Sequence, residues 1–292
     1  MTRPERFEAY WRGVDEELAG VEARCALEPM PRHSTGDFTV WALRMTSIGP
    51  ARIFGYLSIP AGEGPFPAML ETPRYGSVNH VPDWNDRLRY VVLTLMHRGQ
   101  RLADSPFAAA YPGLLTLGIE DEDRYVYRGI AADCLRAAEV LLARPEVDAS
   151  RVAVVGDDLG LITAARRPGF SIARTGAGLF YRADEARRRT RDYPLEELND
   201  VLRASPDLAS AVARTLSLFD PLHHAPDVRA TTLLVDGDDG TWTAPLGDAL
   251  GGDVERYPLT HEGGTDHDRL DEWLAERMGV PAMTRFIRTV AS

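Results

Sequence analysis

A turn bounded by two glycines follows an apolar strand in the middle of the chain. The strand Val152–Val155 leads into Gly156-Asp157-Asp158-Leu159-Gly160. Glycines relieve crowding at a tight turn, so the residue between them is lifted into an exposed position. A carboxylate there, that of Asp158, could act as a base or as a nucleophile. The same five residues also fit an ordinary strand-to-helix turn with Asp as the helix cap, and on their own they favour that second interpretation.

Two later segments carry the residues that would complete a reactive site. An acidic cluster, Val235-Asp236-Gly237-Asp238-Asp239-Gly240, comes first, and His261 follows in a loop bounded by glycines. The order of reactive residue, acid and histidine is the order of the catalytic triad in α/β-hydrolases. We therefore expect Asp158 and His261 to share a site. The alternatives are a solvated acidic turn, which lacks the further oxygen ligands of a calcium site, and a surface histidine.

The elements that would position these residues can be read from the hydrophobic pattern. Apolar runs separated by helical patterns predict a mostly parallel α/β sheet with helices on both faces. One domain, residues 1–292, accounts for the chain, with a charged helical insertion over about 181–214 and a C-terminal helix over 281–292. The expected strands are Phe38–Met45, Arg52–Ile59, Ala68–Glu71, Tyr90–Met96, Arg151–Val155, Thr232–Val235 and Val254–Tyr257. The expected helices are Pro4–Leu18, Tyr127–Ala143 and Asp268–Met278.

The composition excludes several classes of function. The 292 residues are 44% hydrophobic and 26% charged, as in a globular protein. All 33 basic residues are Arg, which excludes Schiff-base and P-loop chemistry because both need Lys. The net charge of −11 argues against nucleic-acid binding. No apolar run approaches the length of a membrane span, and no hydrophobic signal core follows Met1.

Neither cysteine nor histidine suggests a metal site. Two cysteines, Cys25 and Cys134, cannot form a disulfide framework or a Cys-rich zinc site, and a reducing cytoplasm is the simplest compartment. The adjacent pair His223-His224 has no third ligand at a helpful spacing, so we expect no metal there.

Several short motifs are spread along nearly the whole chain. They are Phe7 to Trp11, Tyr75-Gly76, Arg98-Gly99-Gln100, Tyr125 to Ile130, Asp133, Pro145 to Asp148 and His261-Glu262-Gly263-Gly264. Together they resemble the acetyl xylan esterase and cephalosporin-C deacetylase family of α/β-hydrolases.

The departures from the family pattern bear most on function. The family turn Gly-x-Ser-Gln-Gly-Gly has Asp158 in place of Ser and Leu159 in place of Gln, and Arg74 replaces the first Gly of Gly-Tyr-Gly. The resemblance implies that Asp239, with Asp238 as an alternative one residue away, is the triad acid and that His261 is retained.

The resemblance also implies which residues surround Asp158. It implies an oxyanion hole formed by the backbone N–H groups of Tyr75 and Leu159. His97 and Trp242 are weaker candidates for the substrate pocket. The partner expected is a small acetylated molecule, with no cofactor, nucleic acid or membrane. Because family members often form rings, a homo-oligomer is also expected.

Three interpretations of Asp158 remain open. It could be an alkylating nucleophile, as in haloalkane dehalogenases. It could form a proton-abstracting pair with His261, in which either residue is the base, or it could mark an inactive site. A carboxylate that attacked an acetyl ester would form a mixed anhydride, which is a poor route to hydrolysis. The sequence resembles enzymes of tetronate and spirotetronate biosynthesis that eliminate acetate to leave an exocyclic methylene. We therefore favour proton abstraction and loss of acetate, with residual hydrolysis and an inactive site as alternatives.

Overall fold

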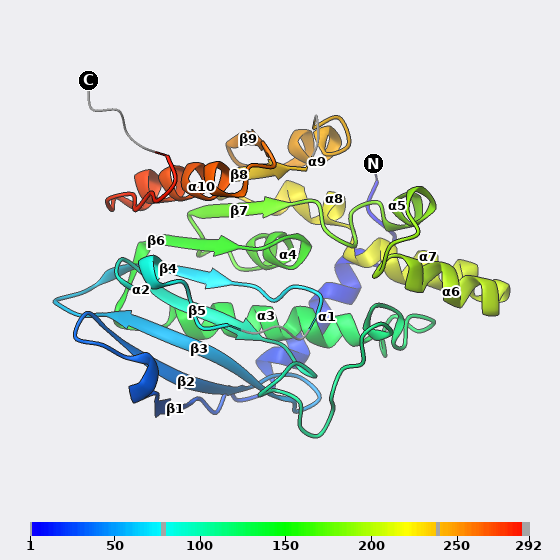
Figure 1. Ribbon diagram of the computed structural model, residues 1–292. Helices are drawn as coiled ribbons and strands as arrows, with labels where there is room; N and C mark the ends of the chain where they lie inside the picture. The colour runs from blue at the N-terminus through cyan, green and yellow to red at the C-terminus, as the bar shows by residue number, and fades with distance from the viewer. Residues whose placement is uncertain (1, 77–79, 238–239, 288–292) are drawn as a thin grey trace.

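The computed structural model describes residues 2–76, 80–237 and 240–287. These residues form a nine-stranded sheet in the order β1-β2-β3-β5-β4-β6-β7-β8-β9 (Figure 1). The first three strands and β5 pair antiparallel, and every pair from β5 through β4 to β9 is parallel. The predicted mostly parallel α/β sheet is therefore confirmed.

The strands include every strand expected from the sequence, most of them extended by a few residues. They are β1 (Ala26–Pro29), β2 (Phe38–Thr46), β3 (Arg52–Pro60), β4 (Phe66–Glu71), β5 (Val91–Met96), β6 (Val147–Val155), β7 (Ile172–Gly176), β8 (Thr231–Asp236) and β9 (Val254–Pro258). The short β1 and β7 were not predicted. Neither carries a long apolar run, and β1 is exposed along its whole length.

Helices cover both faces of the sheet. They are α1 (Phe7–Ala19), α2 (Trp84–Arg87), α3 (Val126–Leu142), α4 (Asp158–Arg166), α5 (Ala183–Arg189), α6 (Glu196–Ala204), α7 (Ala209–Phe219), α8 (Pro221–His224), α9 (Ala244–Ala249) and α10 (Gly263–Met278). None of the helices in the described part of the chain is both long and apolar enough to span a bilayer.

Alternate residues of the central strands face two separate apolar layers. Ala68 and Leu70 of β4 pack in the large core that also holds α1, α3 and α4, while Met69 packs in a smaller core with Leu274 and Met278 of α10. This alternation follows from the two-residue period of a strand. It fixes the sheet between two helical layers and leaves the strand ends free to carry the site.

The segment over 181–214 is helical, and it lies beyond the carboxyl ends of the parallel strands. Figure 1 shows α5, α6 and α7 projecting past the arrowheads of β6 and β7. In open parallel sheets, ligands bind at this edge. The insertion therefore stands where it can contact a ligand at the turn after β6.

The expected C-terminal helix is wrong over its described part. Residues 281–287 have no helical assignment, and 288–292 lie outside the described residues. The backbone N–H groups of Arg285, Phe286 and Ile287 donate to the carboxylate of Asp268 at 3.0, 2.6 and 2.6 Å. Because these N–H groups donate to a buried carboxylate, they are not available for the backbone hydrogen bonds of a helix.

The turn after β6 depends on Gly156. Its φ is +157°, and a Cβ at this position would lie 1.9 Å from Thr72 Oγ1. The backbone of β6 therefore passes closely beside the end of β4 just before α4 begins. This close approach sets the position of Asp158.

We predict that Gly156→Ala lowers the free energy of unfolding by about 1–3 kcal/mol, because the added methyl group meets Thr72 and the φ angle disfavours a side chain. Gly13→Ala is the matched control. It lies inside α1 with no atom within 4 Å of the added Cβ, and should stabilise by about 0.5–1 kcal/mol. Urea unfolding of the three proteins measures both effects. Equal stability of wild type and Gly156→Ala would contradict this account of the turn.

Candidate active site

The Asp158 side chain lies in a cavity at the carboxyl ends of the parallel strands. Asp158 is the first residue of α4 and is 4% exposed. The cavity has a volume of about 420 Å³. It is lined by Pro73, Arg74, Tyr75, His97, Tyr127, Asp157, Asp158, Leu159, Ala177, Gly178, Leu179, Phe180 and Pro194. No Ser, Thr or Cys is among these described lining residues.

The carboxylate of Asp158 binds the loop that follows β7. It accepts hydrogen bonds from the N–H of Gly178 at 2.9 Å and from the N–H of Phe180 at 2.6 Å. A Cβ at Gly178 would lie 2.5 Å from Asp158 Oδ2, so the close approach requires glycine. Asp157 holds the cap position of α4, but its side chain makes no capping hydrogen bond. Neither aspartate side chain is thus a simple helix cap, which was the alternative left open by the sequence.

Burial and hydrogen bonding act in opposite directions on the pKa of Asp158. Burial raises it most, and the two N–H donors from Phe180 and Gly178 lower it. The negative charges of Asp157 and Asp220 raise it further. The result is a pKa of about 7 against an ordinary value of 3.8. A carboxyl group with this pKa can both accept and release a proton near neutral pH.

The turn that carries Tyr75 is held from two sides. The side-chain amide of Gln100 donates to the carbonyl oxygens of Arg74 at 3.1 Å and Gly76 at 2.7 Å. The hydroxyl of Tyr75 donates to Glu197 of α6, and the N–H of Leu115 donates to the same carboxylate at 3.0 Å. Burial, followed by the hydrogen bond to Glu197, raises the pKa of Tyr75.

Gln100 and Glu197 were not predicted as positioning residues. Gln100 was part of a recognised motif, so its role could have been proposed. Glu197 lies in a charged segment with no distinguishing signal. Tyr75 and Leu159, the two residues expected to supply oxyanion donors, line the Asp158 cavity together. Leu159 is the second residue of α4, where a backbone N–H has no partner inside its own helix.

His97 also lines this cavity, as a neutral side chain. It is 1% exposed, and burial lowers its pKa to about 4. Its Nδ1 lies 2.5 Å from the carbonyl oxygen of Arg98. That hydrogen bond requires Nδ1 to carry the proton, which leaves Nε2 as an acceptor.

The next residue is His261, the expected partner of Asp158. It is exposed, with a φ of +62°, in the loop between β9 and α10, and it does not line the Asp158 cavity. Asp238 and Asp239, the candidate acids, lie outside the described residues. The neighbouring Asp236 is buried and forms an ion pair with Arg256 at 3.0 Å.

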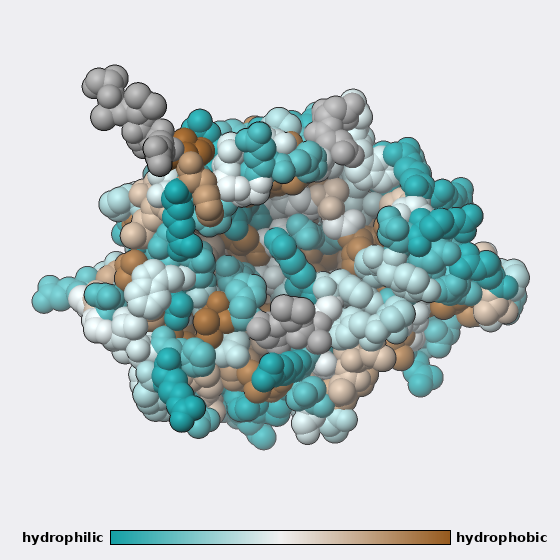
Figure 2. Space-filling model, viewed as in Figure 1, coloured by the Kyte–Doolittle hydropathy of each residue, from teal (hydrophilic) through white to brown (hydrophobic). Residues whose placement is uncertain are grey.

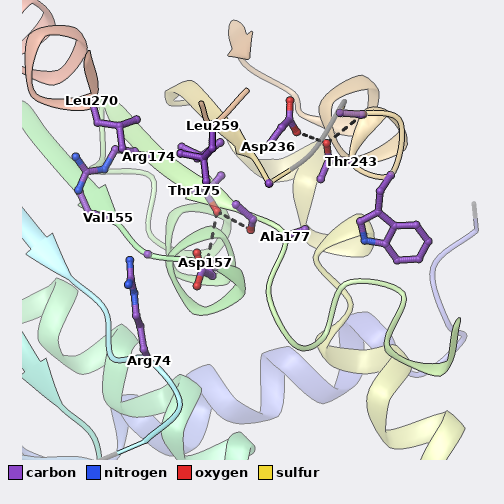
Figure 3. A pocket seen from close by; sticks show the side chains of 16 residues that line it. Arg74, Val155, Asp157, Arg174, Thr175, Ala177, Asp236, Thr243, Leu259 and Leu270 are labelled. Atoms are coloured by element: carbon purple, nitrogen blue, oxygen red, sulfur yellow. Dashed lines mark hydrogen bonds between the residues drawn. The ribbon is translucent and has the colours of Figure 1, made fainter. Parts of the chain in front are cut away.

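Trp242 lines a second cavity, of about 490 Å³ (Figure 3). Its ring lies under two guanidinium groups, those of Arg182 and Arg189, 4.3 and 4.0 Å from its centroid. Figure 2 shows the face above the ends of β6 and β7 hollowed, with hydrophilic side chains reaching over the hollow. Across the described ranges, no group of three or more His, Cys, Asp or Glu side chains could hold a metal ion.

The sequence pattern of the family described as "Acetyl xylan esterase (AXE1)" matches residues 1–246. The chain belongs to the acetyl xylan esterase family. It is therefore an esterase-like α/β-hydrolase in family and fold.

Solved structures support the same fold. An acetyl xylan esterase from Paenibacillus sp. R4 has a TM-score of 0.81 at 22% identity, covering 94% of this chain and 96% of that one. Acetyl xylan esterase 1 from Thermoanaerobacterium sp. JW/SL YS485 has a TM-score of 0.78 at 20% identity, covering 94% of each chain. At these identities the likeness concerns the α/β-hydrolase fold alone.

Among curated proteins, acetyl esterase Axe7A of Xylanibacter ruminicola is 26% identical over 184 residues. The match covers 56% of this chain and 41% of that protein. The chain thus matches less than half the length of this relative.

We predict that the raised pKa of Asp158 makes the protein less stable as pH rises from about 4 to 7. In this interval the folded state holds a proton that the unfolded state has released. The free energy of unfolding of wild type should therefore fall relative to Asp158→Asn by about 1 kcal/mol per pH unit. Urea titrations of both proteins at a series of pH values test this. A difference that stays constant, or that rises with pH, would exclude the raised pKa.

Proposed function

We propose that the protein is a lyase that removes acetic acid from an acetylated tetronate-type intermediate and forms an exocyclic double bond. Asp158 is the base that removes the proton. The observation that carries the proposal is the Asp158 carboxylate in its cavity, with a pKa of about 7, where the family motif has serine.

The reaction balances without any other reactant. Asp158 takes the proton from the ring carbon that carries the acetoxymethyl group. The released electron pair forms a carbon–carbon double bond, the bond from the neighbouring carbon to the acetoxy oxygen breaks, and acetate leaves. Asp158 then returns its proton to solvent.

The backbone donors at Tyr75 and Leu159 have a role in this step. Their N–H groups would stabilise the negative charge that forms on the enolate or on the departing acetate. Gln100 and Glu197 support that role, because they fix the turn on which Tyr75 lies. Family membership supports recognition of an acetyl ester, since the relatives named above are acetyl and acetyl xylan esterases.

The position of His261 bears on the alternative in which Asp158 is an alkylating nucleophile. An aspartyl nucleophile would form an alkyl ester that a second base must help water to cleave, and the family resemblance gives that role to His261. His261 is exposed and outside the Asp158 cavity. Elimination uses one base, so the proposal needs no part for His261, Asp239 or Asp238.

Incubation with an acetylated tetronate in ¹⁸O-water tests the reaction type by mass spectrometry. The proposal predicts acetate together with an alkene that has gained no oxygen. A labelled alcohol would show attack by an aspartyl nucleophile, and an unlabelled alcohol would show ester hydrolysis. Either result, or no turnover across a panel of acetylated tetronates, would overturn the proposal.

We predict that Asp158→Asn and Asp158→Ala lower the rate of elimination on the order of 10²–10⁴-fold, the usual contribution of a general base. Because the base acts when ionised, kcat/KM of wild type should rise with pH through about 7 and level off above it. Asp207→Asn, at an exposed position before α7, is the control and should leave both the rate and its pH profile unchanged. Turnover like that of wild type in Asp158→Ala would remove Asp158 from the mechanism.

A further inference from the structure

The cavity that Trp242 lines adjoins the Asp158 cavity. Arg74, Asp157 and Ala177 line both. A molecule bound over Asp158 can therefore extend past Asp157 into the larger space. Leu259, Leu270 and Trp242 provide apolar surface there.

Two arginines from separate elements line this larger cavity (Figure 3). Arg74 comes from the loop after β4, and Arg174 comes from β7. Neither forms an ion pair with any described residue. By contrast, Arg98 and Arg256 bind Asp133 and Asp236 at 2.7 and 3.0 Å. Two guanidinium groups with no described carboxylate within ion-pair distance, on a shared cavity wall, are suited to a ligand that brings its own negative charge.

The carboxylates around Arg174 already have other partners. Asp86 and Asp271 attract Arg174 electrostatically without forming an ion pair with it. Each instead forms an ion pair with Arg89, at 3.0 and 2.5 Å. Glu71 also attracts Arg174 electrostatically, and it accepts a hydrogen bond from Thr94.

Of the two carboxylates that line the larger cavity, one is free to balance the charge of Arg74 and Arg174. Asp236 is bound to Arg256 and to the hydroxyl of Thr243. Asp157 is the remaining carboxylate among the described lining residues, and it stands against two arginines.

We propose that Arg74 and Arg174 form a subsite for a negatively charged oxygen of the substrate. This deepens the proposed function and rests on it for the identity of the ring. The enol group of a tetronate ring is acidic and is ionised at neutral pH, so the ring itself supplies the anion. Binding of that oxygen by the two arginines would direct the proton-bearing carbon towards Asp158. Arg74 occupies a position where the family motif has glycine, which makes the subsite a departure of this chain from the motif.

Equilibrium binding tests the subsite without any turnover. The probes are a 3-acyltetronate that lacks the acetoxy group and its neutral 4-O-methyl ether, each titrated calorimetrically. We expect wild type to bind the anion at least 10-fold more tightly than the ether. Arg74→Met and Arg174→Met should each weaken binding of the anion by 10-fold or more and leave binding of the ether nearly unchanged. Arg269→Met, an exposed arginine of α10 paired with Glu272, is the control and should bind both probes like wild type.

The outcomes separate this inference from the proposed function. Equal binding of anion and ether by wild type, absence of binding of either, or wild-type affinity for the anion in both variants would overturn the arginine subsite. Should Arg174→Met fail to fold, Arg74→Met decides, because Arg74 is exposed on a loop. A preference for the anion that the variants lose, combined with no release of acetate in the labelling experiment, would keep the subsite and reject elimination.

Discussion

The site depends on the hydrogen bonds between the Asp158 carboxylate and the backbone of Gly178 and Phe180. They join the start of α4 to the loop after β7, two segments that the sheet topology brings to the same edge. The contact is possible because Gly156 allows the tight turn before α4 and Gly178 leaves room for the carboxylate. Among the described residues the carboxylate has two N–H donors and no ion pair, and burial raises its pKa to about 7.

A carboxylate at this position changes which reactions the family scaffold can support. Serine needs a histidine to take its proton before it can attack an acyl group. Asp158 is itself a proton acceptor, and its cavity contains no Ser, Thr or Cys among the described lining residues. The turn that carries Tyr75 is held by Gln100 and Glu197, and Tyr75 lines the same cavity as Asp158. Proton abstraction with anion stabilisation, the reaction proposed above, uses these parts together.

Local patterns predicted the sheet and the strand-to-helix turn at Asp158, because a two-residue period and a glycine-bounded turn are properties of short segments. The burial of the Asp158 side chain was not expected. Features set by distant segments were missed. The carboxylate of Asp268 takes the N–H groups of 285–287, so an amphipathic pattern there did not become a helix. The exposure of His261 depends on the loop before α10. Arg74 and Arg174 line one cavity because of the order of β4, β6 and β7 in the sheet. No local pattern contains that information.

The central claim is that Asp158 changes its protonation state near neutral pH inside the cavity. The most direct test is ¹³C NMR of protein labelled at the aspartate side-chain carboxyl carbons, with the Asp158 signal assigned by its loss in Asp158→Asn. The account predicts that this signal titrates with a midpoint near pH 7. A carboxylate that stays ionised down to about pH 4, the ordinary range for aspartate, would contradict it and leave Asp158 a structural anchor for the loop after β7.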